Sequence, residues 1–387
     1  MGNDGEPMMM AFAIPNPGDS FGKVMQIPKP KPEGPGFALI KVLRAGVCNT
    51  DLEILQGYMG FHGVLGHEFV GVVEEVDGDE ALQKEWVGKR VCGDINVGCA
   101  DCSVCFNAER LDERCCKMSR NHCPNRTVLG ILKRNGTMAE YLTLPVSNLH
   151  VVPDDVPDEE AVFAEPLAAA CRIPEQNLVY YNAQRPDKVA ILGDGKLGLM
   201  IAEVLGREHT KHFATAANDA SPPPPPRPVL FGKHQHKLDL VKDSGVVCKH
   251  VSECKDEKAF NGVAAGHAAQ YDVVVDATGS PAGLSLAAGL CRPMGTLVLK
   301  STCAAGEQFN AAPFVIDELK VVGSRCGPIE KALELLAVRN PEADHVGTEP
   351  LRVTKYITQT FPLNKADEAI LCAKEKSTMK VQIVCNE

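Results

Sequence analysis

Four side chains from three separate stretches of the chain have the chemistry of a catalytic zinc site. Cys48 provides a sulfur, His67 an imidazole, and Glu68 and Glu165 provide carboxylates. A thiolate, an imidazole and one or two carboxylates can hold zinc while leaving one coordination position open. A single Cys is more often a small core residue, so the case for a metal depends on the motifs that accompany it.

A second group of Cys residues has the spacing of a structural metal site. Cys99, Cys102 and Cys105 follow one another at two-residue gaps, so one tight loop directs three sulfurs to one point. A fourth thiolate would complete a tetrahedron. A disulfide framework is the alternative, but 16 Cys without a secretory signal favour a reducing compartment, and therefore zinc. Three more Cys follow closely: Cys115, Cys116 and Cys123.

A glycine pattern further along the chain predicts a dinucleotide-binding turn. The apolar stretch Val189–Leu192 leads into Gly193, Gly195 and Gly198, and an amphipathic helical pattern follows. The first Gly permits a tight turn, the second lets the backbone approach a pyrophosphate, and the third lets helix and strand pack closely. The free N–H groups and the positive dipole end at the start of that helix would bind the phosphates.

The composition is typical of a soluble enzyme large enough for two domains. The chain has 387 residues and a formal net charge of −10, which disfavours general binding to nucleic acid or to an anionic membrane. No apolar run reaches the roughly 18 residues that a membrane span needs. Met8–Ile14 is too short for a signal peptide and is expected to form a first strand. We therefore predict a cytoplasmic protein without nucleic-acid or membrane partners.

Three blocks of sequence must position these residues. Short apolar runs broken by Gly and Pro predict a mostly β unit from about residue 10 to 170. From about 176 to 317, strands alternate with helical patterns, as in the doubly wound parallel sheet of an α/β fold. The last block, from about 318, should return to the first unit. The elements expected in the second and third blocks are the strands Val189–Leu192, Val229–Phe231, Asp272–Asp276 and Thr296–Leu299, then the helix Glu330–Val338 and the strand Lys380–Val384.

A proline-rich insertion interrupts the second block. Residues 207–228 include Ser221 and five consecutive prolines, which can join neither a helix nor a central strand. We expect an exposed polyproline loop between the first helix and the second strand of the nucleotide-binding unit. A docking site for a proline-binding domain is the alternative, but a tolerated surface insertion is the simpler interpretation.

Taken together, these motifs resemble those of the zinc-dependent medium-chain dehydrogenases, the family of zinc alcohol, sorbitol, glucose and threonine dehydrogenases. The resemblance covers nearly the whole chain. It implies a GroES-like β catalytic domain, residues 1–175 and 318–387, interrupted by a Rossmann domain, residues 176–317, with the active site in the cleft between them. The motifs that carry it are Gly46–Asp51, Gly66–Val73, the Cys loop, Glu165–Leu167, Gly193–Gly198 and Asp276–Gly279.

The resemblance also implies roles for individual residues. Cys48 and His67 match the catalytic zinc ligands of the family, and the third protein ligand is Glu68, Glu165 or each of them in turn. Thr50 matches the hydroxyl that takes the alcohol proton, although it could equally bond to nearby backbone. Asp51 is expected to orient a ligand imidazole. Further assignments are weaker: Glu53 as a proton exit or a solvated helix residue, and Gln56, Tyr58 and Phe61 as lining of the pocket or packing of the loop.

The structural zinc loop departs from the family pattern. Members usually place the fourth Cys eight residues after the third, but that position is Glu113 here. The flanking residues around Cys123 match the family's fourth ligand, so we predict a structural zinc on Cys99, Cys102, Cys105 and Cys123. Cys115 and Cys116 then lie in an insertion, where they could compete for the metal, act as an oxidation target or simply stay reduced.

The nucleotide is expected to bind Gly193–Gly198, including Lys196 and Leu197, with Thr278 contributing from a later loop. An NAD enzyme usually has Asp or Glu at the end of the second Rossmann strand to bind the ribose 2′-OH. Here that strand is followed by Gly232 and Lys233, and Lys233 could pair with a 2′-phosphate. This favours NADP over NAD, although the insertion could hide the true register.

We therefore predict a zinc-dependent oxidoreductase that transfers a hydride between a secondary alcohol and NADP or NAD. The Glu165–Leu167 pattern favours polyols, sugars or amino alcohols by analogy with the family. The zinc polarises the substrate oxygen, and the cofactor takes the hydride. Two alternatives remain: a non-catalytic nucleotide-binding or regulatory protein, and a reductase without catalytic zinc. The partner is a small alcohol or ketone, and family members form homodimers or tetramers.

Overall fold

The structure is a computed structural model that describes residues 6–106, 121–182, 185–213, 226–256, 262–301, 311–337 and 349–386. The chain divides into two compact units. Unit 1 comprises Met1–Glu165, Ile329–Val338 and Arg352–Glu387, and unit 2 comprises Pro166–Pro328 and Arg339–Leu351. No helix among the described residues is both long and apolar enough to cross a bilayer, and the cytoplasmic location stays a prediction.

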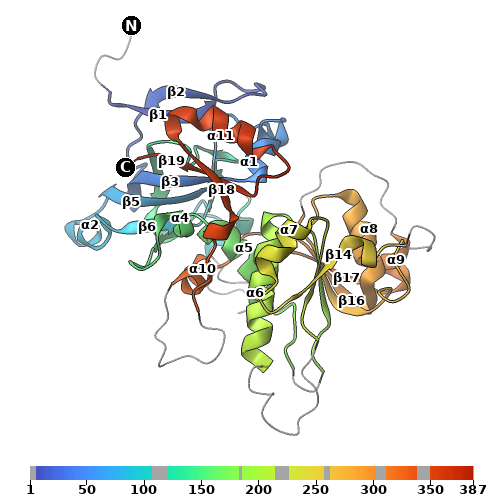
Figure 1. Cartoon of the computed structure of the whole chain (residues 1–387). Helices are drawn as coiled ribbons and strands as arrows, with labels where there is room; N and C mark the ends of the chain where they lie inside the picture. The colour runs from blue at the N-terminus through green and yellow to red at the C-terminus, as the bar shows by residue number, and fades with distance from the viewer. Residues whose placement is uncertain are drawn as a thin grey trace. The chain divides into compact units, whose positions relative to one another are not determined.

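Unit 1 is the predicted GroES-like β unit. Within the described residues its largest sheet has the order β11-β6-β5-β3-β19-β18, with β10 also paired to β3. The C-terminal strands therefore lie beside strands from the start of the chain, as the red and blue ribbons of Figure 1 show. The strands of this sheet are β3 (Phe37–Val47), β5 (Glu68–Val76), β6 (Arg90–Gly93), β10 (Tyr141–Pro145), β11 (Leu149–Val151), β18 (Ile357–Pro362) and β19 (Lys380–Val384).

Two smaller sheets complete the strands of unit 1. The first has the order β2-β1-β4 and the second β7-β8-β9. The predicted first strand, Met8–Ile14, is present as β1. The other members are β2 (Lys23–Pro28), β4 (Gly63–Val64), β7 (Asn96–Val97), β8 (Thr127–Leu129) and β9 (Lys133–Arg134).

Short helices connect the strands of unit 1. The α-helices are α1 (Asn49–Ile54), α2 (Glu80–Trp86), α3 (Ser103–Phe106), α4 (Asp158–Ala161), α10 (Ile329–Leu336) and α11 (Ala366–Ala373). The 3₁₀ turns are η1 (Tyr58–Gly60), η3 (Val146–Asn148), η7 (Thr354–Tyr356) and η8 (Leu363–Lys365). Helix α5 (Ala164–Glu175) begins in unit 1 and continues in unit 2.

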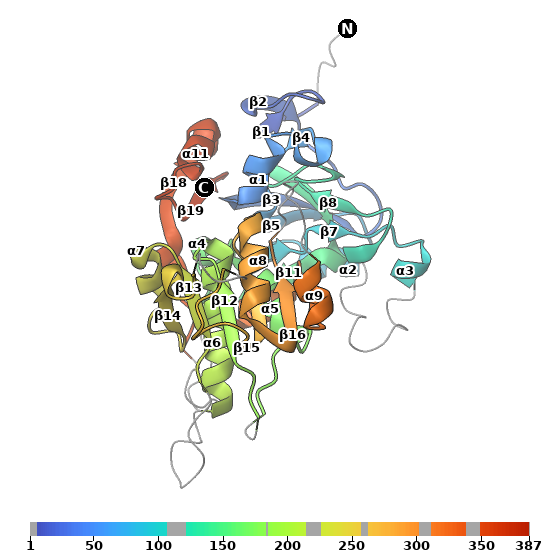
Figure 2. The same cartoon turned by 90° about the vertical axis from the view of Figure 1, so that its right-hand side faces the viewer.

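Unit 2 is the predicted Rossmann domain. Its described strands form a parallel sheet with the order β14-β13-β12-β15-β16-β17, in which the order reverses between β12 and β15. Figure 2 shows β14, β13 and β12 side by side. Ligands of such sheets bind outside the carboxyl ends of the strands at the reversal point. The strands are β12 (Val189–Leu192), β13 (Val229–Gly232), β14 (Val247–His250), β15 (Tyr271–Asp276), β16 (Cys291–Leu299) and β17 (Lys320–Gly323).

The helices of unit 2 cover both faces of this sheet. Helix α6 follows β12 and helix α8 follows β15, and the two lie on opposite faces (Figure 1). This arrangement follows from right-handed crossovers that run in opposite directions from the centre of the sheet. The bounds are α6 (Lys196–Phe213), α7 (Gln235–Leu238), η5 (Asp239–Val241), η6 (Val251–Glu253), α8 (Pro281–Leu290) and α9 (Ala312–Ile316).

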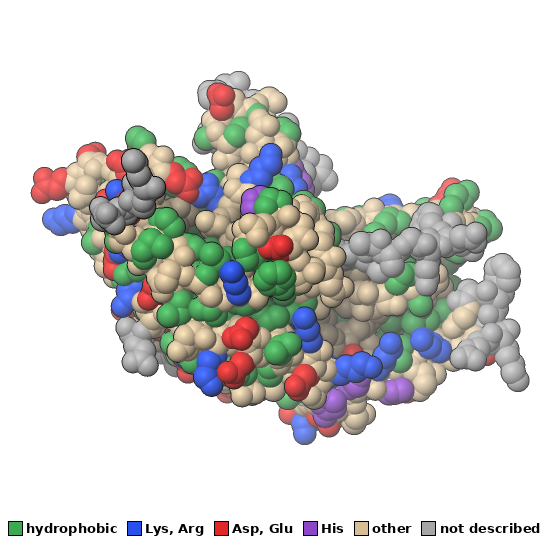
Figure 3. All heavy atoms as spheres, turned by 90° about the horizontal axis from the view of Figure 1, so that it is seen from above, with side chains coloured by type: hydrophobic (Ala, Val, Ile, Leu, Met, Phe, Trp, Pro, Cys, Tyr) green, Lys and Arg blue, Asp and Glu red, His purple; other side chains and the backbone are tan. Residues whose placement is uncertain are grey.

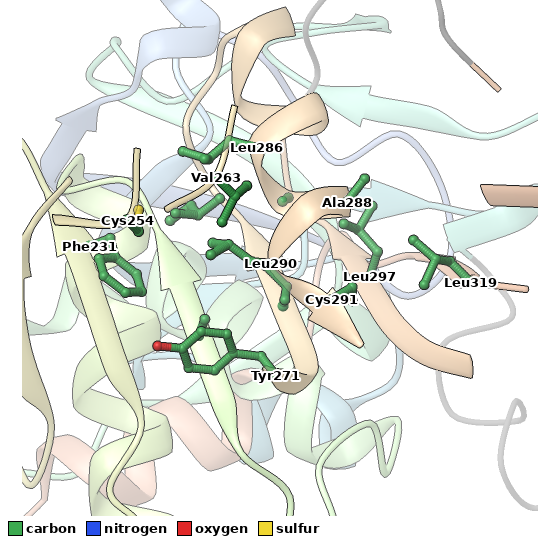
Figure 4. Packing of buried hydrophobic residues seen from close by; sticks show 14 residues of the cluster. Phe231, Cys254, Val263, Tyr271, Leu286, Ala288, Leu290, Cys291, Leu297 and Leu319 are labelled. Carbon is green, nitrogen blue, oxygen red and sulfur yellow. The ribbon is translucent and has the colours of Figure 1, made fainter. Parts of the chain in front are cut away.

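The core of unit 2 joins the sheet to α8. Phe231 from β13, Tyr271 from β15, Leu290 from α8 and Leu297 from β16 belong to one buried apolar cluster (Figure 4). Burial of apolar area on this scale is the main source of stability for the sheet.

On the surface of the molecule, Lys and Arg side chains lie among Asp and Glu side chains on the face shown in Figure 3.

Some boundaries differ from those expected from the sequence. Strand β17 pairs with β16, so unit 2 continues to Pro328 instead of ending at 317. The first change of unit falls inside α5, after Glu165, and not at 175. Residues 207–213, expected in the insertion, continue helix α6. Most of the proline-rich stretch, residues 214–225, lies outside the described residues.

Candidate active site and dinucleotide-binding loop

The site in unit 1 begins where strand β3 ends. Cys48 follows β3 directly and precedes helix α1, whose residue Asp51 is fully buried. The Asp51 carboxylate accepts hydrogen bonds from Cys48 N (2.8 Å) and from Gly66 N (3.1 Å). One buried side chain therefore ties the turn that carries Cys48 to the turn before His67.

Strand pairing brings the other two candidate ligands to the same place. Glu68 opens strand β5 and pairs with Gly46 of β3. A Cβ at Gly46 would clash with the Glu68 carboxylate, so a Gly is required for this close approach. Gly66 has φ +93°, a left-handed conformation that a Gly adopts without strain. The turn at Gly66 directs His67 toward Cys48.

Three candidate ligands come together. One ligand atom each from Cys48, His67 and Glu68 lies within 4.8 Å of the other two. His67 and Glu68 are buried, at 3% and 1% exposure. The Nδ1 atom of His67 faces Asp51 Oδ1 at 3.4 Å, which leaves Nε2 for a metal.

The buried polar atoms of this group fit a metal ion. Glu68 Oε1 is buried without a hydrogen-bond partner, although buried polar atoms nearly always have one. Burial lowers the pKa of His67, but the charges of Asp51 and Cys48 outweigh this effect and hold it well above the usual value. A cation placed among Cys48, His67 and Glu68 would satisfy the carboxylate oxygen, which supports the predicted zinc.

A buried lysine that was not identified from the sequence lies beside the group of Cys48, His67 and Glu68. The Lys380 ammonium, on β19, forms an ion pair with Glu68 Oε2 and lies 3.5 Å from Val47 O. It is 1% exposed, and its charge lies 5.5 Å from the centre of the Phe163 ring. Burial lowers the pKa of Lys380, but Glu68 and Cys48 raise it more. No local pattern predicts this contact, because the two residues of the pair are 312 positions apart.

Two further predicted residues lie close to the group without joining it. Glu165 lies in the first turn of α5. Burial raises the pKa of Glu165 to about 7. The nearby His67 lowers this pKa, and the charge of Glu68 raises it further. Among the described residues, Glu165 is not part of the 4.8 Å group, so its role as a ligand stays a prediction. Thr50 Oγ1 lies 3.8 Å from Cys48 Sγ.

Other residues named from the sequence have local partners or lie elsewhere. Glu53 accepts a hydrogen bond from Asn49 at 2.9 Å, and burial raises its pKa. Phe61 is buried, Tyr58 is half-buried and Gln56 is exposed. Glu113, Cys115 and Cys116 lie outside the described residues.

The four-Cys group has sulfur spacings that fit one shared metal ion. The sulfurs of Cys99, Cys102, Cys105 and Cys123 all lie within 4.8 Å of one another. Cys123 Sγ is 3.5 Å from Cys99 Sγ and 3.6 Å from Cys102 Sγ. Tetrahedral zinc with Zn–S bonds of about 2.3 Å separates its sulfurs by about 3.8 Å, whereas a disulfide bond is about 2.05 Å long. The spacing thus fits zinc and excludes a disulfide between these pairs.

The glycine loop in unit 2 leaves space for a phosphate group. Gly193 has φ +110°, and a Cβ there would lie 2.5 Å from Ala277 O. A Cβ at Gly198 would clash with Gly193 O, so both glycines are needed for packing. A Cβ at Gly195, however, would meet no heavy atom within 4 Å. This open position, beside the N-terminus of α6, fits the backbone approach that a pyrophosphate requires.

The remaining predicted cofactor residues occupy different settings. Lys196 and Leu197 form the first turn of α6. The Thr278 hydroxyl donates to Asp276 Oδ1 at 2.8 Å, so it stabilises its own loop. Lys233 is exposed at the end of β13, and its backbone N–H donates to Asp194 at 2.8 Å. Asp194, inside the glycine loop, was not singled out from the sequence.

Comparisons with known proteins agree with this geometry. The alcohol dehydrogenase GroES-like domain model matches residues 34–154, and the zinc-binding dehydrogenase model matches residues 227–338. The chain is 28% identical over 406 residues to erythritol/L-threitol dehydrogenase of Mycolicibacterium smegmatis, covering 99% of both chains.

Two solved structures show the same fold. A Sinorhizobium meliloti 1021 protein described as a zinc-binding dehydrogenase, solved with NADP, has a TM-score of 0.73 and 24% identity over 98% of this chain and 100% of its own. The Escherichia coli CFT073 alcohol dehydrogenase rspB, solved with NADH, has a TM-score of 0.74 and 24% identity over the same shares. With both family models matched, the Cys48 group and the four-Cys group in place, the chain belongs to the zinc-containing medium-chain dehydrogenase family.

Proposed function

We propose that the protein is a zinc-dependent dehydrogenase that transfers a hydride between a secondary alcohol and a nicotinamide dinucleotide. The observation that supports this most is the group of half-buried Cys48 with buried His67 and Glu68, in which Glu68 Oε1 has no hydrogen-bond partner. A non-catalytic nucleotide-binding protein or a zinc-free reductase has no chemical need for such a group. Glu165 is proposed as the exchangeable fourth protein group near the metal.

The residues of unit 1 would hold the metal and handle the proton. Zinc, when bound, supplies a Lewis acid that lowers the pKa of a substrate hydroxyl, and the nicotinamide accepts the hydride. Asp51 fixes the positions of the turns that carry Cys48 and His67. Thr50, whose hydroxyl lies 3.8 Å from Cys48 Sγ, takes the proton of the substrate hydroxyl and passes it toward solvent.

The substrate is proposed to be a polyol, a sugar or an amino alcohol. The full-length relative named erythritol/L-threitol dehydrogenase acts on small polyols, according to its name. At 28% identity the two chains need not share one substrate, so a C4–C6 polyol series is the first set to screen.

The cofactor is proposed to bind at the Gly193–Gly198 loop as NAD or NADP. The argument for NADP from the sequence has two parts: position 232 is a glycine instead of an acidic residue, and Lys233 could pair with a 2′-phosphate. The carboxylate of Asp194, however, lies against Gly232, 3.0 Å from where a Cβ would be. This contact weakens the argument for NADP.

Zinc content tests the proposed metal sites. We expect elemental analysis to find two zinc ions per chain in the wild type and one in Cys48→Ala, with turnover lost and dinucleotide binding kept. Cys372→Ala, on α11, is the matched control and should retain both ions. An unchanged zinc content in Cys48→Ala would remove the basis of the mechanism. If the wild type holds only one zinc and has reductase activity, the protein is a reductase without catalytic zinc. If it holds two zinc ions but turns over no alcohol, its role is non-catalytic.

A homodimer is proposed through the edge of the Rossmann sheet. Within the described residues β17 pairs only with β16, so its other edge is open to pairing. Exposed apolar side chains lie in β17 and in the neighbouring elements β16 and α9: Val321 (47%), Met294 (62%), Val315 (74%) and Ile316 (77%). Light scattering of the wild type and of Val321→Lys would test this proposal, since the variant should be monomeric. A wild-type monomer would contradict it, and a tetramer would indicate a second interface.

A further inference from the structure

The second Rossmann strand ends without an acid in sequence, yet a carboxylate lies there in the structure. Strand β13 ends at Gly232, next to the carboxyl end of β12. Asp194, in the loop after β12, places its Cβ 2.7 Å and its Oδ2 3.0 Å from the position that a Cβ on Gly232 would occupy. Its carboxylate thus fills the space that the side chain of a strand-end residue would take.

Asp194 makes the contacts that hold the loop after β13. Its Oδ2 accepts hydrogen bonds from Lys233 N (2.8 Å), His234 N (2.7 Å) and His234 Nδ1 (2.9 Å). Asp194 is 8% exposed. Burial raises its pKa, but the His234 backbone N–H, the His234 ring and the Lys233 N–H lower it more, and the pKa lies below its usual value. Asp194 therefore remains a charged group.

These contacts bear directly on which dinucleotide fits. A ribose 2′-OH can donate a hydrogen bond to a carboxylate at the end of the second strand, whereas a 2′-phosphate there meets a like charge. The two N–H groups of Lys233 and His234, which would otherwise be donors for a phosphate, already bond to Asp194. The His234 ring is paired with the same carboxylate.

The positive charge of Lys233 does not cancel the repulsion between Asp194 and a 2′-phosphate. Its side chain is exposed, so its charge is screened by water and salt, while the buried Asp194 charge is screened much less. The nearer and more buried group should decide the selectivity.

We propose that Asp194 replaces the missing strand-end acid, binds the adenosine ribose 2′-OH and makes the protein select NAD over NADP. This proposal rests on the proposed use of a nicotinamide dinucleotide. It reverses the preference suggested by Gly232 and Lys233 alone, and it makes Asp194 a specificity-determining residue supplied by the first loop in place of the second strand.

Direct binding tests the proposal without depending on turnover. Calorimetric titration of the zinc-loaded protein with NADH and NADPH, and with 5′-AMP and adenosine 2′,5′-bisphosphate, measures the effect of the 2′-phosphate alone. We expect the wild type to bind the ligands without a 2′-phosphate about 100-fold more tightly. Asp194→Asn should reduce this ratio by about tenfold or more, mainly by improving NADPH binding.

Two variants separate the proposal from its competitors. Asp243→Asn removes the same charge from an exposed position of the same unit and should leave the ratio unchanged. Lys233→Ala should leave it nearly unchanged as well, whereas a phosphate-binding Lys233 would selectively weaken NADPH binding in this variant. If Asp194→Asn does not fold, the wild-type ratio and the Lys233→Ala result still decide between the two.

The outcomes are distinct. Tighter binding of NADPH by the wild type, or an unchanged ratio in a folded Asp194→Asn protein, would overturn the proposal. Failure of the wild type to bind any of the four ligands would instead contradict the proposed function itself.

Discussion

Lys380 and Glu68 form a buried ion pair although 312 positions separate them in the chain. Each side chain is 1% exposed. The pair joins the first residue of β19 to the first residue of β5. It neutralises Oε2 of the Glu68 carboxylate, whose Oε1 has no hydrogen-bond partner and which groups with the candidate zinc ligands Cys48 and His67. The ammonium thus limits Glu68 to one free oxygen for a metal.

Removing Lys380 should be costly for folding. Lys380→Met leaves the Glu68 carboxylate buried without its partner, which we expect to lower the free energy of unfolding by about 3–5 kcal/mol. The double variant Lys380→Met/Glu68→Gln should recover most of this loss, because no charge remains unpaired. Urea unfolding of the metal-free protein measures both. Lys331→Met, which breaks an exposed pair with Glu334, should change stability by less than about 0.5 kcal/mol. Equal effects at positions 331 and 380 would contradict the assignment.

The two later glycines of the nucleotide loop should respond differently to an added methyl group. Gly198→Ala clashes with Gly193 O and should destabilise the protein by about 1–3 kcal/mol. Gly195→Ala meets no heavy atom within 4 Å, so the melting temperature should hold. Its methyl group would occupy the phosphate space, and NADH binding should weaken about tenfold or more. Thermal melts and NADH titration check the pair; normal NADH binding by Gly195→Ala would place the phosphates elsewhere.

Asp194 should contribute a pH-dependent part of the stability. Its pKa in the folded protein lies below the usual 3.8, so folding favours the charged form. The contribution is complete above the unfolded value and disappears as the pH falls through the folded value. The wild type should therefore be more stable than Asp194→Asn at pH 6, and the difference should shrink as the pH approaches 3. Denaturant unfolding at several pH values measures it; a difference that grows toward low pH would show the opposite sign.

The four-Cys group should hold one metal ion independently of the Cys48 group. Cys102→Ser should lose one zinc and lower the melting temperature, because the loop then lacks its tetrahedral centre. The remaining zinc should stay bound and protect the Cys48 thiol from alkylation. Zinc analysis and mass spectrometry after mild alkylation test this expectation. Loss of both ions from Cys102→Ser would mean that the two groups are coupled.

Much of the fold was predictable because its strands are buried and apolar. The stretches Val189–Leu192 and Tyr271–Asp276 are almost fully buried, so apolar runs marked them clearly. Strands β14 and β17 were missed because they lie at the two edges of the sheet and are largely exposed. An edge strand carries little apolar pattern, so its sequence resembles a loop.

The candidate site was predictable only where spacing carries the chemistry. The Cys99–Cys105 spacing belongs to one loop and could be read directly. Lys380 and Asp194 could not be identified in this way, since their partners are 312 and 39 or 40 positions away. Such contacts depend on strand pairing. The local sequence around a lysine or an aspartate does not show whether that residue is exposed in a loop or buried against a distant partner.

The position of β19 also has a consequence for synthesis. This strand lies between β3 and β18, and Lys380 follows Val47, its neighbour across the sheet, by 333 positions. Residues Phe37–Lys41 of the same edge pair with β10, but at about 5–20 residues per second the Arg44–Val47 part of β3 stays unpaired for tens of seconds. An open, apolar strand edge on a nascent chain is a template for intermolecular pairing. We therefore expect the newly made protein to depend on chaperones until its last strand closes the sheet.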